Sequence, residues 1–130
     1  MGEDVVKNWL ALARYDIETA KAMLDAGRYL YVAFTCQQAV EKTLKAIIVR
    51  HRKQAPPHTH NLLRLVEEVK DRLDADSRRL ETLEKLNAYY IESRYSEEYA
   101  ELTRLIGKKE AAGLYRDTLK ILEWLRACTT

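Results

Sequence analysis

Residues 29–53 read YLYVAFTCQQAVEKTLKAIIVRHRK, and this stretch decides the fold. Its small and apolar side chains recur every three or four residues, which is the spacing of one face of an α-helix. Because the apolar stripe is broad, we expect the most buried helix of the protein here. Prolines end it, since proline lacks a backbone donor and disfavours helical geometry in the residue before it. The stripe consists of Ala33, Cys36, Val40, Leu44 and Ile47, widened by Ala39, Thr43 and Ala46, and the stop is Pro56-Pro57.

A first helix is predicted before this stretch. Asp4 is a suitable N-cap, and Gly27 is placed to end the helix. Between them, apolar residues repeat at helical steps. These residues are Val6, Leu10, Ala13, Ile17, Ala20 and Leu24.

Three more helices are predicted after a loop at 54–60. Asn61 caps the third helix, which fades near residues 74–76. A fourth begins near Ser77, and residues 92–99 interrupt or bend it. A final helix follows Gly107 and ends near Ala127. Their apolar positions are Leu62, Leu65, Val66 and Val69, then Leu80, Leu83, Leu86 and Tyr90, then Ala111, Leu114, Leu122 and Leu125 with Tyr115, Thr118 and Ile121 alongside.

The fold class is therefore all-α. Only four glycines and two prolines punctuate the 130 residues, and the segments between them carry no alternating pattern. Residues 1–130 have the length of a single domain. Short connections between long helices favour antiparallel neighbours, so we expect an up-and-down antiparallel bundle of four main helices plus a shorter fifth element.

Composition narrows the class of function. Lys and Arg number 22 against 20 Asp and Glu, so the net charge of +2 does not indicate nucleic acid and a binding surface must be local. The two cysteines, Cys36 and Cys128, show no pairing or ligand spacing, which favours a reducing compartment. No signal peptide or membrane span is visible, so a cytoplasmic protein without membrane contact is expected.

Three motifs occur in a recognisable order. The central helix contains Gln37-Gln38-Ala39-Val40-Glu41-Lys42-Thr43-Leu44-Lys45-Ala46, the following loop ends in His58-Thr59-His60-Asn61-Leu62, and later comes Tyr89-Tyr90-Ile91-Glu92-Ser93-Arg94-Tyr95. In this order and spacing they resemble the HEPN family of prokaryotic nucleotide-associated proteins. The segment from Trp9 through Asp16 to Leu24 also resembles the family's first helix, so the likeness covers almost the whole chain.

The resemblance implies a helical bundle similar to the C-terminal domain of kanamycin nucleotidyltransferase, commonly as a homodimer. Many family members are encoded with, or fused to, a minimal nucleotidyltransferase. Others are toxins of toxin-antitoxin pairs that cut RNA without a metal and carry Arg, four to six residues, then His. No cofactor is implied.

This sequence departs from the ribonuclease pattern. Arg94 matches the arginine, but Tyr99 stands where a histidine would follow four intervening residues, and no histidine occurs after His60. A histidine would matter because imidazole moves protons near neutral pH while arginine holds a phosphate. Tyrosine, with a pKa near ~10, is a poor base at pH 7. Arg52 and His58 have the spacing but straddle the proline break, so we treat that match as accidental.

Candidate nucleotide- or RNA-binding residues lie first on the central helix. Gln38, Lys42 and Lys45 share a side with Tyr31, Phe34 and Glu41 and offer amide and ammonium groups to an anionic ligand. The alternative is a partly solvated face on which Glu41 and Lys45 form an ordinary i,i+4 pair.

Arg94 and Tyr95 are the second set of candidates. With Tyr89-Tyr90 they present a guanidinium and phenol rings to a nucleotide. In the alternative interpretation Tyr90 belongs to the core and Arg94 pairs with a nearby glutamate.

Other polar residues favour structural roles. The spacing of His58 and His60 suits half of a metal site, but no cysteine or carboxylate nearby in sequence completes a ligand set, so a structural role in the loop is preferred and no metal is expected. The basic run 50–53 suits the C-terminal end of a helix dipole. Asp16 borders the apolar stripe of the first helix, and its role stays open.

The leading hypothesis is a catalytically incomplete protein of this kind that binds a nucleotide or RNA, acting as a homodimer with a minimal nucleotidyltransferase partner. One rival is a metal-independent ribonuclease toxin that uses Arg94 with Tyr99 or a different residue. The other is a structural interaction module without a ligand, whose central-helix face makes a dimer. No catalytic residue is assigned.

Overall fold

The computed structural model describes residues 2–92, 104 and 106–129, and every regular element among them is a helix. The helices are α1 (Glu3–Asp25), α2 (Tyr29–Arg52), α3 (Leu62–Glu68), α4 (Ser77–Glu92) and α6 (Lys108–Ala127). The all-α class is confirmed. None of the described helices combines the length and the apolar character that crossing a membrane requires.

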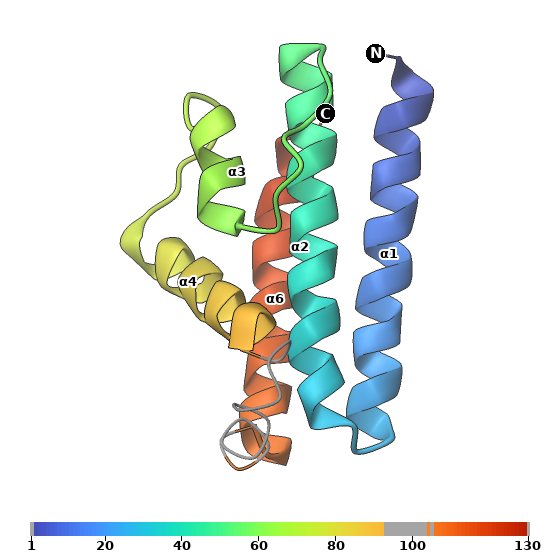
Figure 1. The fold of residues 1–130 in the computed structure, drawn as a ribbon, viewed down its shortest axis with the longest axis vertical. Coiled ribbons are helices and arrows are strands. Elements are labelled where there is room, and N and C mark those ends of the chain that lie inside the picture. Colours follow the sequence, from blue (N-terminus) through green and yellow to red (C-terminus); the bar gives the residue numbers. More distant parts are fainter. Residues whose placement is uncertain (1, 93–103, 105, 130) are drawn as a thin grey trace.

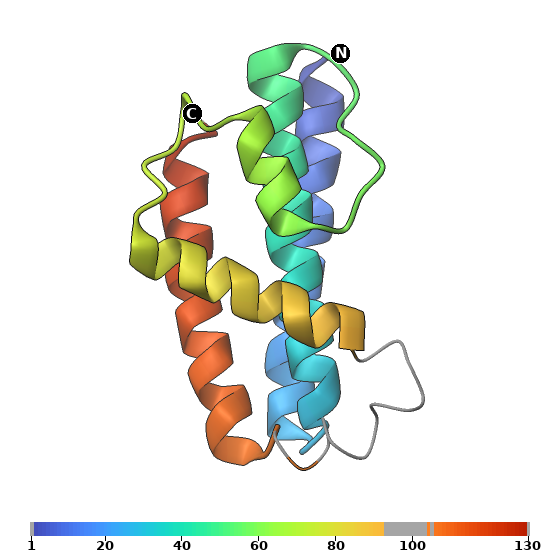
Figure 2. The same ribbon diagram turned by 60° about the vertical axis from the view of Figure 1, so that its left-hand side comes forward.

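Three long helices lie side by side (Figure 1). α1 and α2 form an antiparallel hairpin, whereas α6 runs in the same direction as α2. α4 lies across α2 and α6 instead of alongside them, with the short α3 above it (Figure 2). The structure is a helical bundle, but its fourth helix is oblique. Periodicity specifies which face of a helix is buried and not the angle at which it crosses its neighbours.

α2 is the centre of the core, as predicted. It contacts every other described helix, and its predicted stripe, including the widening residues, is buried throughout. Leu83 and Leu86 of α4 and Leu114, Leu122 and Leu125 of α6 close the same core. A smaller cluster joins Val6 of α1 to Ala46 and Val49 near the end of α2.

The helix ends follow local chemistry, with one correction. Asp4 is not the N-cap of α1; Gly2 holds that position in an extended conformation. Asp4 instead lies in the first turn, where a carboxylate interacts favourably with the helix dipole. Gly27, with φ of 76°, follows the end of α1 and turns the chain toward α2.

The other predicted boundaries agree closely. α2 ends at Arg52, and Lys53 adopts a left-handed conformation as its C-cap. Asn61 caps α3 by accepting hydrogen bonds from the backbone N–H groups of Leu63 and Arg64. α4 begins at Ser77 and reaches Glu92, so the rest of the predicted interruption at 92–99 lies outside the described residues.

Candidate functional site

A buried carboxylate lies at the middle of α2. The side chain of Glu41 is only 4% exposed, yet three donors surround it. Lys45 Nζ donates to Glu41 Oε2 at 3.1 Å, His60 Nδ1 lies 2.8 Å from Glu41 Oε1, and Gln37 Nε2 donates to the same oxygen at 3.4 Å. A buried charge is tolerated when it is paired and hydrogen-bonded in this way.

The glutamines of α2 fasten the His60 loop to the helix. Gln37 Nε2 donates to the backbone oxygen of His60 at 2.6 Å, and Gln38 Nε2 donates to Gln37 Oε1 at 2.8 Å. These bonds supply the partners that a buried amide requires. Together with Glu41 they fix both the backbone and the imidazole of His60.

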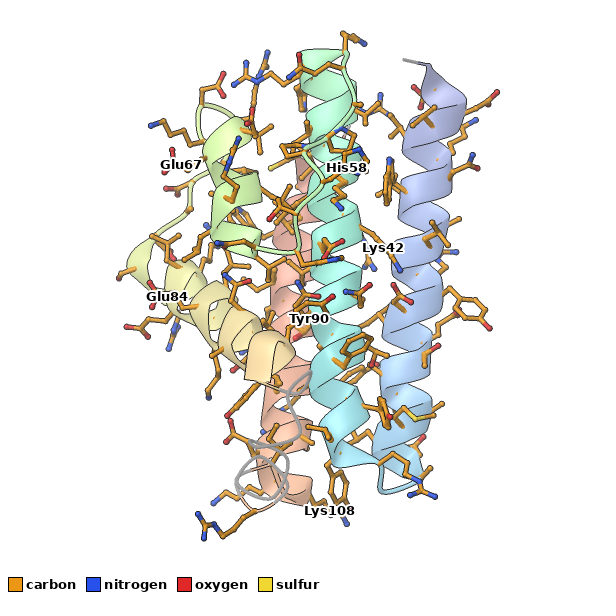
Figure 3. The ribbon with its side chains drawn as sticks, in the orientation of Figure 1. Lys42, His58, Glu67, Glu84, Tyr90 and Lys108 are labelled. Carbon is orange, nitrogen blue, oxygen red and sulfur yellow. The ribbon has the colours of Figure 1, made fainter. Side chains whose placement is uncertain are left out.

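Lys42 joins α2 to α1. Its ammonium lies 2.5 Å from the Asp16 carboxylate, and both side chains are less than one-fifth exposed. Figure 3 shows Lys42 in the space between the two helices. The pair answers the open question about Asp16, which serves as the counter-charge of Lys42.

The ammonium group of Lys45 is even less accessible to a ligand than that of Lys42. Its side chain is 9% exposed, and its ammonium sits 5.5 Å from the ring centroid of Trp9 while it pairs with Glu41. The two lysines of this face therefore each have a carboxylate partner. An anionic ligand at either lysine must compete with a carboxylate already in place.

An aromatic row connects the His60 loop to α4. The rings of His60 and Tyr90 are 5.2 Å apart, and Tyr90 stacks on Phe34 of α2 at 5.1 Å. Tyr90 is buried, while the imidazole of His60 is 52% exposed. The row brings the loop, α2 and the last turns of α4 to one place; in sequence, Arg94 follows Tyr90 by four residues.

His60 is held in one orientation. Because a carboxylate only accepts hydrogen bonds, Nδ1 donates to Glu41, and Nε2 is the ring nitrogen left for another partner. Within the described part of the chain, that nitrogen has no hydrogen-bond partner. We predicted a structural role for His60 and did not anticipate its buried carboxylate partner, although Glu41 and His60 stood in neighbouring motifs.

Of the predicted binding residues, the structure gathers Gln38, Lys42 and Lys45 on one face of α2. Arg94 and Tyr95, like Tyr99, lie outside the described residues. The described residues hold no group of three or more His, Cys, Asp and Glu side chains suited to a metal.

The basic run at the end of α2 makes structural contacts. Arg50 pairs with Glu3 of α1 at 2.7 Å, and His51 Nε2 lies 2.8 Å from the Cys128 backbone oxygen after α6. Arg52 pairs with Asp71 at 2.7 Å. These side chains attach the end of α2 to its neighbours.

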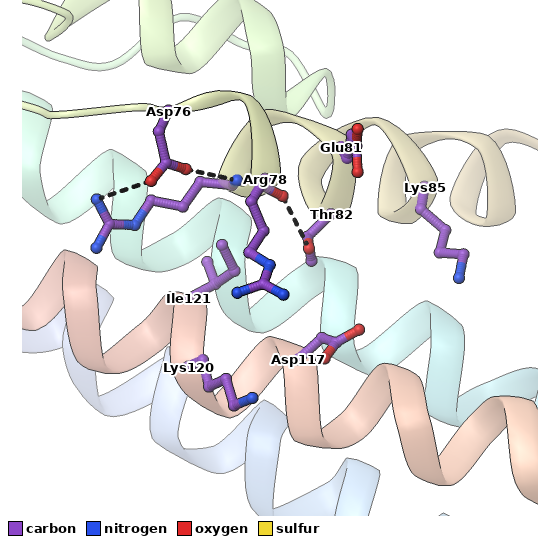
Figure 4. Close-up of a pocket in the computed structure, with 9 residues that line it drawn as sticks. Asp76, Arg78, Glu81, Thr82, Lys85, Asp117, Lys120 and Ile121 are labelled. Atoms are coloured by element: carbon purple, nitrogen blue, oxygen red, sulfur yellow. Dashed lines mark hydrogen bonds and ion pairs between the residues drawn. The ribbon is translucent and has the colours of Figure 1, made fainter.

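A second polar feature, unforeseen in the sequence, is a cavity of about 570 Å³ between α4 and α6. Figure 4 shows the Arg78 guanidinium reaching from α4 toward α6, where Asp117 and Lys120 lie. The available signal was Arg78-Arg79 in the first turn of α4, where helices favour acidic side chains. The lining residues are Asp76, Arg78, Arg79, Glu81, Thr82, Lys85, Asp117, Lys120 and Ile121.

Two of the cations around this cavity are already engaged. Arg79 lies 4.0 Å from the Asp76 carboxylate, and its guanidinium is 4.6 Å from the ring centroid of Trp124. Lys85 pairs with Glu110 at 3.1 Å. Burial raises the pKa of Glu110, but hydrogen bonds from Lys85 and Tyr89 outweigh it, so this carboxyl titrates below its usual range.

Comparison with known proteins identifies the family. The chain is similar to the crystal structure of TT1696 from Thermus thermophilus, with a TM-score of 0.82 and 28% identity over 95% of this chain and 97% of that one. No protein of curated function matches significantly. The family model of the HEPN domain matches residues 6–128. Since that match spans nearly the whole chain, this protein belongs to the HEPN family.

Proposed function

We propose that this protein binds a nucleotide or RNA, acts as a homodimer, and works with a minimal nucleotidyltransferase partner without cleaving RNA itself. The supporting observation is the meeting of Gln37, His60 and Tyr90, which come from three separate motifs; Gln38 joins them only through Gln37. The aromatic row places a half-exposed imidazole beside the helix that leads in sequence to Arg94 and Tyr95. Aromatic rings and arginine are the groups that stack on bases and hold phosphates.

The ligand contacts divide into two kinds. Arg94 and Tyr95 are proposed as the direct contacts, arginine to phosphate and tyrosine to base. Gln38 and Lys42 lie on the α2 face proposed from the sequence, and Lys42 reaches a ligand only by leaving Asp16. Lys45 contributes indirectly, since it neutralises Glu41.

Direct binding tests this proposal. Fluorescence anisotropy with a labelled single-stranded RNA and a labelled nucleotide should show saturable binding by the native protein. Arg94→Ala should weaken it by about tenfold or more, because one charge-assisted hydrogen bond is worth about 1.5–3 kcal/mol. Lys70→Ala is the matched control, since Lys70 is 71% exposed beyond α3 and pairs with Glu67 at 3.4 Å. Equal affinities for the two variants would contradict the assignment of Arg94.

The partner is tested separately. Sedimentation of the protein mixed with the minimal nucleotidyltransferase encoded nearest to its gene should show a faster-moving complex. Independent sedimentation of the two proteins would reject the partnership while leaving the ligand proposal intact. A folded dimer that binds neither ligand nor partner would support the purely structural module.

A second candidate function is RNA cleavage without a metal, and the Glu41–His60 pair favours it. Nε2 of His60 accepts the proton of a ribose 2′-hydroxyl, the 2′-oxygen forms a bond to the adjacent phosphorus, and the bond to the 5′-oxygen breaks. That 5′-oxygen takes a proton from water, leaving a 2′,3′-cyclic phosphate. The histidine absent after Arg94 would then come from the loop before α3.

The two candidates make opposite predictions. Under ribonuclease chemistry, chelator-treated protein cuts RNA, and His60→Ala or Arg94→Ala abolishes cutting while the fold, checked by circular dichroism, persists. Under the binding proposal, native protein leaves RNA intact. Cleavage that survives both substitutions would point to a contaminating nuclease and reject the ribonuclease candidate.

A further inference from the structure

The cavity between α4 and α6 is lined by two cations that are not engaged by a neighbouring side chain, Arg78 and Lys120, in the part of the chain that the structure describes. Arg78 and Lys120 reach it from opposite helices, and within the described part of the chain neither side chain forms a hydrogen bond or an ion pair. Arg79 and Lys85, by contrast, are held by Asp76 and Glu110. The cavity therefore has anion-binding capacity that the protein does not itself use.

Arg78 and Lys120 are both exposed and carry the same charge on one cavity, so each raises the electrostatic energy of the other. Arg78 also lies in the first turn of α4, where the helix dipole disfavours a cation. An anion between Arg78 and Lys120 relieves both effects. The cavity volume of about 570 Å³ falls within the range of about 300–1,000 Å³ that small-molecule sites occupy.

The face of α2 lacks this capacity. There Lys42 is paired with Asp16 at 2.5 Å and Lys45 with Glu41 at 3.1 Å. A phosphate arriving at α2 must displace a carboxylate, whereas a phosphate arriving between α4 and α6 displaces none from Arg78.

We propose that the cavity between α4 and α6 binds phosphate groups, with Arg78 and Lys120 as their direct contacts. As a statement about a nucleotide or RNA ligand this rests on the proposed function, but phosphate binding itself does not. Arginine presents a fork of donors to two phosphate oxygens, and lysine adds a point charge. Asp117 of α6 lines the same cavity (Figure 4), and its carboxylate repels an anion there, so it limits the binding affinity.

The opposing charge makes the proposal sharply testable. Isothermal titration with inorganic pyrophosphate, at low salt, should show one site in the native protein. The double variant Arg78→Ala/Lys120→Ala should lose at least about tenfold in affinity, and Asp117→Asn should gain about twofold to tenfold, since a neighbouring like charge is removed. Lys70→Ala should match the native protein. Affinity should also fall as salt rises.

The source of the phosphate is decided by repeating the titration with ATP and with a short single-stranded RNA. If the native protein binds ATP more tightly than RNA, the phosphate belongs to a free nucleotide. If the double variant loses more affinity for RNA than for ATP, the phosphate belongs to the RNA backbone. No pyrophosphate binding by the native protein, or equal binding by the double variant with intact circular dichroism, would overturn the proposal. Failure of the proposed function looks different, because pyrophosphate then binds while ATP and RNA do not.

Discussion

At the scale of single residues, Glu41 is a buried carboxylate that several polar side chains share as a partner. Its carboxylate is almost fully buried and holds Lys45, His60 and Gln37 together. Removing one partner of a buried pair leaves the other without a counter-charge, which is far more costly than losing an exposed pair. The stability of this side of α2 thus depends on one acidic group.

Glu41→Gln should lower the free energy of unfolding by about 3 kcal/mol, because the ammonium of Lys45 stays buried without its carboxylate. Urea denaturation followed by circular dichroism measures the change. Glu67→Gln is the matched control, since Glu67 is 64% exposed and pairs with Lys70 at 3.4 Å; its effect should stay below about 0.5 kcal/mol. Similar losses in the two variants would show that the Glu41 cluster is not a specific stabilising unit.

Cys36 should make stability depend on alkaline pH. Burial raises the pKa of its thiol from 9.0 to about 12. Between pH 9 and about pH 12 the thiol is ionised in the unfolded chain and protonated in the folded chain. The free energy of unfolding therefore falls as the pH rises through this range. The contribution of Cys36 is therefore unchanged below about pH 9 and falls by about 1.4 kcal/mol per pH unit above it.

The measurement is the unfolding free energy from pH 8 to pH 10.5 for the native protein and for Cys36→Ala. The variant is less stable overall but should show a shallower decline, because only the native protein carries this thiol. Parallel curves would contradict the prediction. The pKa of Cys36 could not be predicted from the sequence. The apolar stripe predicted that this residue is buried, but not how completely its thiol is removed from water, which determines the pKa.

At the scale of elements, α3 depends on its cap. The helix has only seven residues, and isolated helices of that length do not persist in water. Asn61 Oδ1 accepts from Leu63 and Arg64 N–H and also from Asn87 Nδ2 at 2.8 Å. Asn87 Oδ1 in turn accepts from Leu62 N–H at 2.9 Å, so α4 helps to cap α3.

Asn61→Ala should therefore destabilise the protein by about 1–2 kcal/mol, at the upper end of the range for a lost cap. Hydrogen exchange should show faster exchange for the amides of Leu63 and Arg64. Asn61→Asp keeps the acceptor and should lose much less. Unchanged exchange in Asn61→Ala would show that packing alone holds α3.

Helix positions were largely predictable because local chemistry sets them. The stripe of α2 and the prolines beyond it predicted its limits within a residue, and Asn61 predicted the start of α3. The prediction for Asp4 was wrong, because the helix begins at Glu3 with Gly2 as its cap and Asp4 lies in the first turn. The oblique path of α4 was not predictable, since its apolar positions are the same whether it lies along or across α2.

At the scale of the whole molecule, the site is an assembly of distant segments. Lys42 and Asp16 are 26 residues apart in sequence, and His60 and Glu41 are 19 apart. The candidates on α2 were found because they share one helix. The pairing of Lys45 with Glu41 follows from i,i+4 spacing within α2. The Lys42–Asp16 pair, the Glu41–His60 contact and the cavity between α4 and α6 arise from packing, which no spacing within a helix encodes.

The homodimer is a prediction at this scale. Sedimentation equilibrium over a range of concentrations should give twice the chain mass of 15.2 kDa. Dissociation on dilution should follow mass action without loss of helical circular dichroism, if each protomer's core is complete. A constant mass of 15.2 kDa would exclude a dimer at those concentrations.

The shared direction of α2 and α6 has a consequence for folding kinetics. The α1–α2 hairpin forms by closing the short turn at Gly27. Docking α6 beside α2 instead closes a long loop, the segment of chain between Arg52 and Lys108. Loop-closure entropy therefore favours the hairpin as the folding nucleus, with α6 added late. Core substitutions such as Ala20→Gly should slow folding, and Leu122→Ala should mainly speed unfolding; the reverse pattern in stopped-flow experiments would place the nucleus elsewhere.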